Sequence, residues 1–174
     1  MEDLKSQIRT IPDWPKKGVM FRDITTLLKH PQSFNKMIEL FYERYKDREI
    51  DLVAGIESRG FILGGALAHR LNKGFVPIRK SGKLPAATTK HEYYLEYGKD
   101  ILEIHNDAIM PGQSILLVDD LIATGGSSLA AIKLIESLGG KISEVAFIID
   151  LPELKGKEKL NGYNTFSLIQ FEGE

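Results

Sequence analysis

Two adjacent carboxylates and a small polar loop stand between an apolar run and a helical pattern in the segment LLVDDLIATGGSS, residues 116–128. The loop would present consecutive backbone N–H groups at a helix N-terminus, where the helix dipole adds partial positive charge. Its two glycines allow positive φ and a close approach of the backbone to a ligand. We therefore predict a phosphate-binding loop made of Ala123, Thr124, Gly125, Gly126 and Ser127.

Asp119 and Asp120 come directly before this loop, and their carboxylates would repel each other unless a ligand used both. Vicinal ribose hydroxyls would do so, because each carboxylate accepts O–H bonds and a 5′-phosphate lies one ribose length away. A capping acid beside a solvated acid is the alternative interpretation. The chain has no Gly-Lys-Ser/Thr after the loop and no G-x-G-x-x-G, which excludes a Walker A loop and a dinucleotide fingerprint.

This string of an apolar strand, two acids and a Thr-Gly-Gly-Ser loop resembles the motif of the type I phosphoribosyltransferases that binds 5-phosphoribosyl-1-pyrophosphate (PRPP). The resemblance implies that Asp119 and Asp120 hold the ribose hydroxyls and that residues 123–127 hold the 5′-phosphate. It extends from about Ile8 to Phe171 and includes LKGKEKL near the C-terminus. Its departures are small: Glu57 stands where some members have aspartate, and Ser127 stands where threonine is common.

A second motif, GIESRG at residues 55–60, ends an apolar run and opens a helical one. Arg59 is placed there to pair with phosphate oxygens, although an arginine lying along the start of a helix is the alternative. The resemblance makes this segment the pyrophosphate loop, with Ser58 and Arg59 as ligands and Arg59 as a catalytic group that stabilises the leaving pyrophosphate. The family loop often contains a non-proline cis peptide, which we expect at the Glu57–Ser58 or the Ser58–Arg59 bond.

A basic string, RKSGKLPAATTKHEYYLEYGK at residues 79–99, resembles the adenine-specific branch of the family. On charge alone it would be an exposed flexible loop. The resemblance implies that Arg79 and Lys83 bind pyrophosphate, an arrangement that could cross a dimer interface, and that the segment around residues 92–98 is a mobile flap. Glu96 would carry the proton chemistry at adenine N7, and Tyr97 would bond a phosphate oxygen or pack the flap. An exposed glutamate on a strand is the alternative for Glu96.

The N-terminal string WPKKGVMFRDIT completes the resemblance. It implies that Phe21 stacks on the purine and that the backbones of Met20 and Arg22 read its N1/N6 edge, although the pattern alone allows Phe21 to be a core residue. The implied reaction transfers the phosphoribosyl group from PRPP to N9 of adenine and gives AMP and pyrophosphate. We expect Mg²⁺ as the cofactor, held through PRPP with no direct protein ligand.

Composition and charge exclude several kinds of chemistry and argue against some functions. The chain has 174 residues, a net charge of -1 and no cysteine, which excludes disulfides and thiolate chemistry. It has no signal-peptide pattern and no apolar stretch that could span a membrane, so we expect a cytoplasmic enzyme. Its charge argues against a PRPP-sensing regulator that binds nucleic acid. A transferase for hypoxanthine, guanine or xanthine and a catalytically dead relative also remain open, and the resemblance implies a homodimer.

The elements that must position these residues follow from hydrophobic periodicity. Strands alternate with helices, and several strands are apolar throughout. This pattern predicts one α/β domain over residues 1–174, with a mainly parallel twisted sheet and helices on both faces. The resemblance adds a hood from residues 1–32 and a flap hairpin within residues 80–105. Strands are expected at 51–56, 74–79, 114–120, 144–151 and 166–171, with a two-stranded excursion around Gly98. Helices are expected at 33–47, with Ser33 as N-cap, at 60–72 and at 126–140, and residues 80–91 are expected to form a loop.

Overall fold

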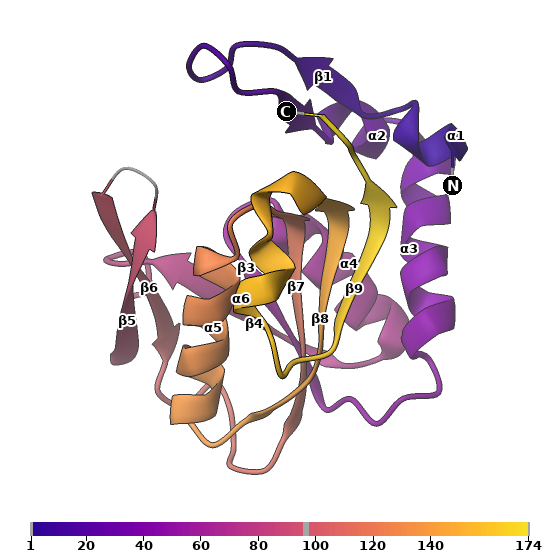
Figure 1. Cartoon of the computed structure of the whole chain (residues 1–174). Helices are drawn as coiled ribbons and strands as arrows, with labels where there is room; N and C mark the ends of the chain where they lie inside the picture. Colours follow the sequence, from indigo (N-terminus) through magenta and orange to yellow (C-terminus); the bar gives the residue numbers. More distant parts are fainter. Residues whose placement is uncertain (1, 96–97, 174) are drawn as a thin grey trace.

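A seven-stranded sheet forms the centre of the computed structural model, which describes residues 2–95 and 98–173 (Figure 1). The strand order is β5-β6-β4-β3-β7-β8-β9. The parallel strands are β4 (Gly74–Lys80), β3 (Leu52–Ile56), β7 (Ser114–Ile122), β8 (Lys141–Asp150) and β9 (Thr165–Gln170). The prediction of a mainly parallel sheet is therefore confirmed.

Helices cover both faces of this sheet, as expected for parallel strands that are apolar throughout. Helices α3 (Pro31–Tyr45) and α4 (Gly60–Leu71) pack on one face, and α5 (Gly126–Ser137) packs on the other (Figure 1). Successive side chains of β7 point alternately to the two faces of the sheet. Leu116 and Val118 belong to the first apolar cluster, whereas Ile115 and Leu117 belong to the second.

Strands β5 (Thr88–Leu95) and β6 (Gly98–His105) form the expected antiparallel hairpin around Gly98. The hairpin extends the main sheet, because β6 pairs with the end of β4. Two sequence expectations are wrong. Residues 80–91 are not all loop, because β4 continues to Lys80 and β5 begins at Thr88. The start of β5 is largely exposed at the sheet edge, so it lacks the apolar alternation that marks a strand.

The second correction concerns the start of α3. The helix begins at Pro31 with His30 as N-cap, and not with Ser33. Proline at the first helical position has a suitable φ and needs no N–H partner, which explains the earlier start.

The N-terminal residues form a separate small layer, the hood, beyond the carboxyl ends of the parallel strands (Figure 1). It contains α1 (Glu2–Lys5), the antiparallel pair β1 (Arg9–Ile11) and β2 (Phe21–Asp23), and α2 (Thr25–Leu28). The 3-10 helix η1 (Pro152–Leu154) and α6 (Gly156–Lys159) lie between β8 and β9. The assignment of residues 1–174 to one domain, with limits of 1–32 for the hood and 80–105 for the flap, stays a prediction.

In the part of the chain that the structure describes, no helix combines the length and the apolar character needed to cross a bilayer.

Asp23 fixes the turn between β2 and α2 within the hood, and its contribution to stability depends on pH. Its carboxylate is 6% exposed and accepts hydrogen bonds from Thr25 Oγ1 at 2.7 Å, Thr25 N at 2.9 Å and Arg9 Nε at 3.1 Å. The bond from the Thr25 hydroxyl is the main cause that lowers the pKa of Asp23 from 3.8 to about 2. A carboxyl whose pKa is lower in the folded than in the unfolded state stabilises the fold at pH values above its unfolded-state pKa. This stabilisation is lost as the pH falls toward the folded-state pKa.

We expect the free energy of unfolding to lose about 2 kcal/mol from this group between about pH 4 and pH 2. Urea unfolding as a function of pH measures this loss, and Asp23→Asn should flatten the slope over that interval. Asp107→Asn, at an exposed aspartate, serves as the control and should keep the slope of the parent. An Asp23→Asn slope equal to that of the parent would show that Asp23 does not cause the loss.

Candidate active site

A cavity of about 280 Å³ lies at the carboxyl ends of β3, β4 and β7. These strands are neighbours in the sheet, so the loops that follow them lie side by side, as ligand sites do in open α/β sheets. Of the residues singled out from the sequence, the cavity is lined by Ser58, Arg59, Asp119, Asp120, Ala123, Thr124, Gly125, Gly126 and Ser127. Glu57, Lys80 and Tyr93 also line it.

The loop after β7 has the geometry expected of a phosphate loop. Helix α5 begins at Gly126, and Gly125 is its N-cap with φ of 76°. A Cβ atom on Gly125 would lie 2.4 Å from Gly156 O, and one on Gly156 would lie 2.2 Å from Ala123 O. The loop therefore packs backbone to backbone against the first residue of α6. The sequence pattern marked Gly125, whereas Gly156 was visible only as part of LKGKEKL.

Asp119 and Asp120 are buried at the end of β7, at 8% and 5% exposure. Asp120 N donates to Asp119 Oδ1 at 2.8 Å. Burial raises the pKa of both carboxyls; the Asp120 charge raises that of Asp119 further, whereas Arg59 opposes the rise at Asp120. Arg59 Nε lies 3.0 Å from Asp120 Oδ2.

The contact between Arg59 and Asp120 is an ion pair that leaves polar atoms without hydrogen bonds. Among the described residues, Arg59 Nη1 and Asp120 Oδ2 are buried and have no hydrogen-bond partner. Buried polar atoms without partners are costly, and in a cavity they indicate where a ligand would bind. The pair offers one donor for an anion and one acceptor for a hydroxyl.

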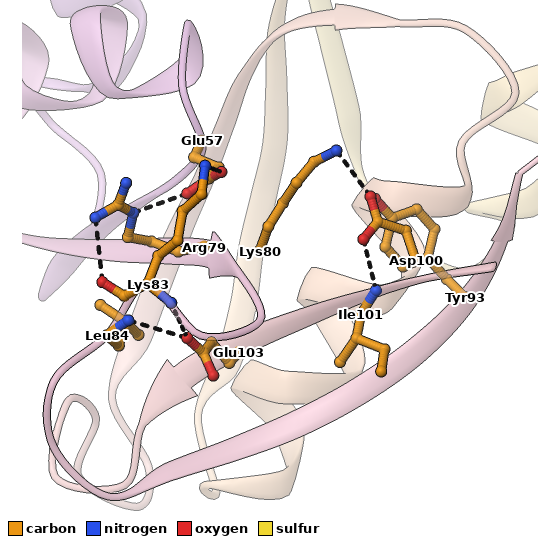
Figure 2. A network of polar contacts seen from close by, with 9 residues as sticks. All are labelled: Glu57, Arg79, Lys80, Lys83, Leu84, Tyr93, Asp100, Ile101 and Glu103. Atoms are coloured by element: carbon orange, nitrogen blue, oxygen red, sulfur yellow. Dashed lines mark hydrogen bonds and ion pairs between the residues drawn. The ribbon is translucent and has the colours of Figure 1, made fainter.

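Glu57 connects the two loops that were expected to bind pyrophosphate. Arg79 Nε donates to Glu57 Oε2 at 2.7 Å, and Lys83 Nζ donates to Glu57 Oε1 at 2.7 Å (Figure 2). Burial opposes ionisation of this carboxyl, but the bonds from Lys83 and Arg79 outweigh it and lower its pKa. Arg79 and Lys83 thus reach the cavity wall through Glu57 and are not themselves part of the lining. The sequence marked Glu57 only as a variant of aspartate.

The peptide bond between Glu57 and Ser58 is cis, at the first of the two positions expected from the resemblance.

A second carboxylate, Glu103, shapes the same segment. It is 1% exposed and accepts hydrogen bonds from the backbone N–H groups of Lys83, at 2.9 Å, and Leu84, at 3.0 Å (Figure 2). These bonds turn the chain after β4 back over β6, so that the Lys83 side chain faces Glu57. Sequence analysis did not single out Glu103, since it appears there as one acid in the strand pattern DILEIH.

Lys80 and Tyr93 were also not selected as site residues from the sequence. Lys80 Nζ lies 2.8 Å from Asp100 Oδ2, and Tyr93 donates to the same oxygen at 3.3 Å (Figure 2). Burial, followed by the Asp100 charge, raises the pKa of Tyr93 to about 12, so it remains a neutral donor. The only signal for Lys80 was its place in the basic string.

The residues expected to bind the base lie in the hood, outside the lining of the cavity. The Phe21 ring centre is 5.1 Å from the Arg59 guanidinium and 4.4 Å from the Trp14 ring. The Arg22 side chain is 7% exposed. The roles of Met20, Phe21 and Arg22 therefore stay predictions, although Phe21 contacts a residue of the cavity wall.

Glu96 and Tyr97 lie outside the described residues, in the connection between β5 and β6. Within residues 2–95 and 98–173, no group of three or more His, Asp or Glu side chains is arranged to hold a metal ion.

Comparisons with known proteins agree with this geometry. The family model described as phosphoribosyl transferase domain matches residues 23–173. An adenine phosphoribosyltransferase of Desulfosudis oleivorans is 55% identical over 172 residues, which are 99% of each chain. The crystal structure of the adenine phosphoribosyltransferase from Thermoanaerobacter pseudethanolicus is 52% identical, with a TM-score of 0.95 over 98% of this chain and 99% of that one. The Saccharomyces cerevisiae enzyme, solved with an imino-altritol bisphosphate and adenine, is 41% identical, with a TM-score of 0.92 over 97% of each chain.

Gly156→Ala tests the backbone contact beneath the loop. A Cβ atom 2.2 Å from Ala123 O must displace the loop, so we expect the affinity for ribose 5-phosphate to fall about tenfold or more in calorimetry. Gly65→Ala, in α4 with no atom within 4 Å of the added Cβ, is the matched control and should bind as the parent does. Equal binding by both variants would contradict the role of the contact.

Proposed function

This chain belongs to the adenine phosphoribosyltransferase family, and we propose that the cavity between the Glu57 loop and the Ala123–Ser127 loop is its active site. The enzyme transfers the 5-phosphoribosyl group of PRPP to N9 of adenine and releases AMP and pyrophosphate, a purine-salvage reaction. The observation that carries the placement is the meeting of a phosphate loop, two buried carboxylates and the Arg59 guanidinium in one cavity.

The buried carboxylate pair is proposed to bind the ribose of PRPP. Asp119 and Asp120 would accept hydrogen bonds from its vicinal hydroxyls, which would satisfy Asp120 Oδ2. The loop from Ala123 to Ser127 would hold the 5′-phosphate at the N-terminus of α5, where backbone N–H groups and the helix dipole favour an anion.

The cations near the cavity are proposed to stabilise the leaving pyrophosphate. Arg59 would donate its unpartnered Nη1 to a phosphate oxygen, and Ser58 would add a hydroxyl. Arg79 and Lys83 would together add one net positive charge, since Glu57 neutralises one of the two. Fixed charges where negative charge develops lower the barrier without a covalent intermediate.

The same cavity fits substrate bound with Mg²⁺. Its two buried carboxylates are only partly compensated by Arg59, so they suit a substrate that carries a divalent cation. When bound, the ion neutralises charge on the pyrophosphate of PRPP. We propose that it is held through the substrate, with no direct protein ligand.

The base is proposed to bind between the hood and the flap. Phe21 would stack on the purine, and the backbones of Met20 and Arg22 would read its N1/N6 edge, which discriminates against 6-oxopurines. Glu96 would handle the proton at N7, and Tyr97 would bond a phosphate oxygen. A closed flap would exclude water, which competes with adenine for the reactive sugar.

We also propose a cytoplasmic homodimer without a nucleic-acid or membrane partner, as the family resemblance implies.

A base panel tests the reaction. With PRPP and Mg²⁺, we expect AMP from adenine and no nucleotide from hypoxanthine, guanine or xanthine, measured by chromatography. Chelation of the metal should abolish product formation. Formation of a nucleotide from another base would agree with the PRPP site but contradict the proposed recognition of the base edge. The absence of product from every base would favour a PRPP-binding regulator.

Glu96→Gln tests the proton role. The amide cannot exchange a proton at N7, so we expect kcat to fall by about 10²-fold or more, while the affinity for PRPP changes less than twofold. Glu92→Gln, at an exposed strand residue of the same hairpin, is the control and should retain kcat within about threefold. An unchanged kcat for Glu96→Gln would exclude the proton role.

A further inference from the structure

The side chain of Arg22 faces away from the cavity, although its backbone, in strand β2, is proposed to read the base. Successive side chains of a strand point to opposite faces, and Phe21 and Arg22 are neighbours in β2. Phe21 faces Arg59 in the cavity wall, with 5.1 Å between its ring centre and the guanidinium. Arg22 points the other way and donates to Thr10 Oγ1, in the paired strand β1, at 2.6 Å.

On that side Arg22 meets the last described residues, Phe171–Gly173, here called the C-terminal tail. The tail continues from β9 and reaches the hood (Figure 1). Arg22 Nη2 donates to Gly173 O at 2.8 Å, and the guanidinium lies 4.5 Å from the Phe171 ring centre. One side chain therefore holds both the strand pair of the hood and a segment 151 residues away in the sequence.

The C-terminal tail is itself fixed to the central domain. Phe171 N donates to Asp150 O, at the end of β8, at 3.1 Å. Gly173 N donates to Glu153 Oε1 at 2.8 Å. The tail thus connects the central sheet to the hood, at the strand that carries Phe21.

We propose that the C-terminal tail positions strand β2, which carries the proposed adenine-binding residues, with Arg22 and Phe171 as the positioning residues. The inference rests on the proposed base site at Met20, Phe21 and Arg22. Phe171 and Arg22 do not touch the base through their side chains; they fix the height and angle of β2 above the cavity. Loss of their contact lets β2 shift relative to Arg59, which weakens adenine binding but leaves the phosphate loop intact, since that loop is held by α6.

Two variants separate this role from general stability. Phe171→Leu keeps an apolar side chain but removes the ring face, and Arg22→Lys keeps the charge but removes the fork that reaches two acceptors. For each we expect the KM for adenine to rise about fivefold to tenfold and the KM for PRPP to stay within about twofold. Phe171→Tyr retains the ring and should restore the parent values.

Lys5→Ala is the matched control, because Lys5 Nζ lies 5.1 Å from the same ring but belongs to α1. It should leave both KM values within about twofold of the parent. An effect of Lys5→Ala equal to that of Arg22→Lys would overturn the specific role of Arg22. Parallel rises in both KM values, or no change in either, would overturn the proposal, and Arg22→Lys decides if Phe171→Leu does not fold.

Phe21→Ala in the same assay distinguishes this inference from the base site on which it rests. A raised KM for adenine in Phe21→Ala, without an effect of the tail variants, would contradict the role of the tail but support the proposed base site. An unchanged KM for adenine in Phe21→Ala would overturn both.

Discussion

The parallel pairing of β3 with β4 on one side and with β7 on the other determines where the Glu57 loop and the phosphate loop lie. Parallel strands end at the same edge of a sheet, so the loops after these three strands must meet there. The pairing depends on burial of both faces, because the strands carry apolar side chains in both directions. The packing that stabilises the sheet therefore also assembles the site.

Charge compensation is the second feature of the site. Two carboxylates buried side by side at the end of β7 would be unfavourable if both were ionised, and burial raises the pKa of each. Arg59 compensates for part of this charge. On the other side of the cavity, the cationic side chains of Arg79 and Lys83 pair with Glu57 and lower its pKa. A ligand that brings both anionic oxygens and hydroxyls would meet complementary groups on either side of the cavity.

The hood and the β5–β6 hairpin lie outside the run of parallel strands, and each joins the centre through residues buried in a core cluster. Strand β6 pairs with β4 at the last two residues of β4, Arg79 and Lys80, and β5 is the edge strand. Tyr93 of β5 and two residues of β6, Leu102 and Ile104, are buried in the second apolar cluster. The hood contacts the rest through Leu4 of α1, through Ile24 and Leu27 in the first apolar cluster, and through the C-terminal tail. Burial of the hairpin residues fixes the hairpin beside the cavity, whose lining includes Tyr93 and Leu102.

The sequence by itself determined the parts of the protein that are contiguous in the chain. The string LLVDDLIATGGSS contains strand, acids, loop and helix start in order, so local patterning was enough to place Asp119, Asp120 and the loop from Ala123 to Ser127 at one edge. The parallel core strands could also be predicted from the sequence, because burial of both faces makes them apolar throughout. The exposed start of β5 could not be predicted, since an edge strand with one neighbour needs no apolar alternation.

Only the tertiary structure decided the contacts between distant segments. Glu57 meets Lys83 across 26 residues, Gly156 lies under Ala123, and Arg22 reaches Gly173 across 151 residues. Such partners follow from the order of strands in the sheet and from the path of each loop. Periodicity encodes which face of an element is buried, but not which other element covers it, and this is the physical reason why these contacts were absent from the sequence analysis.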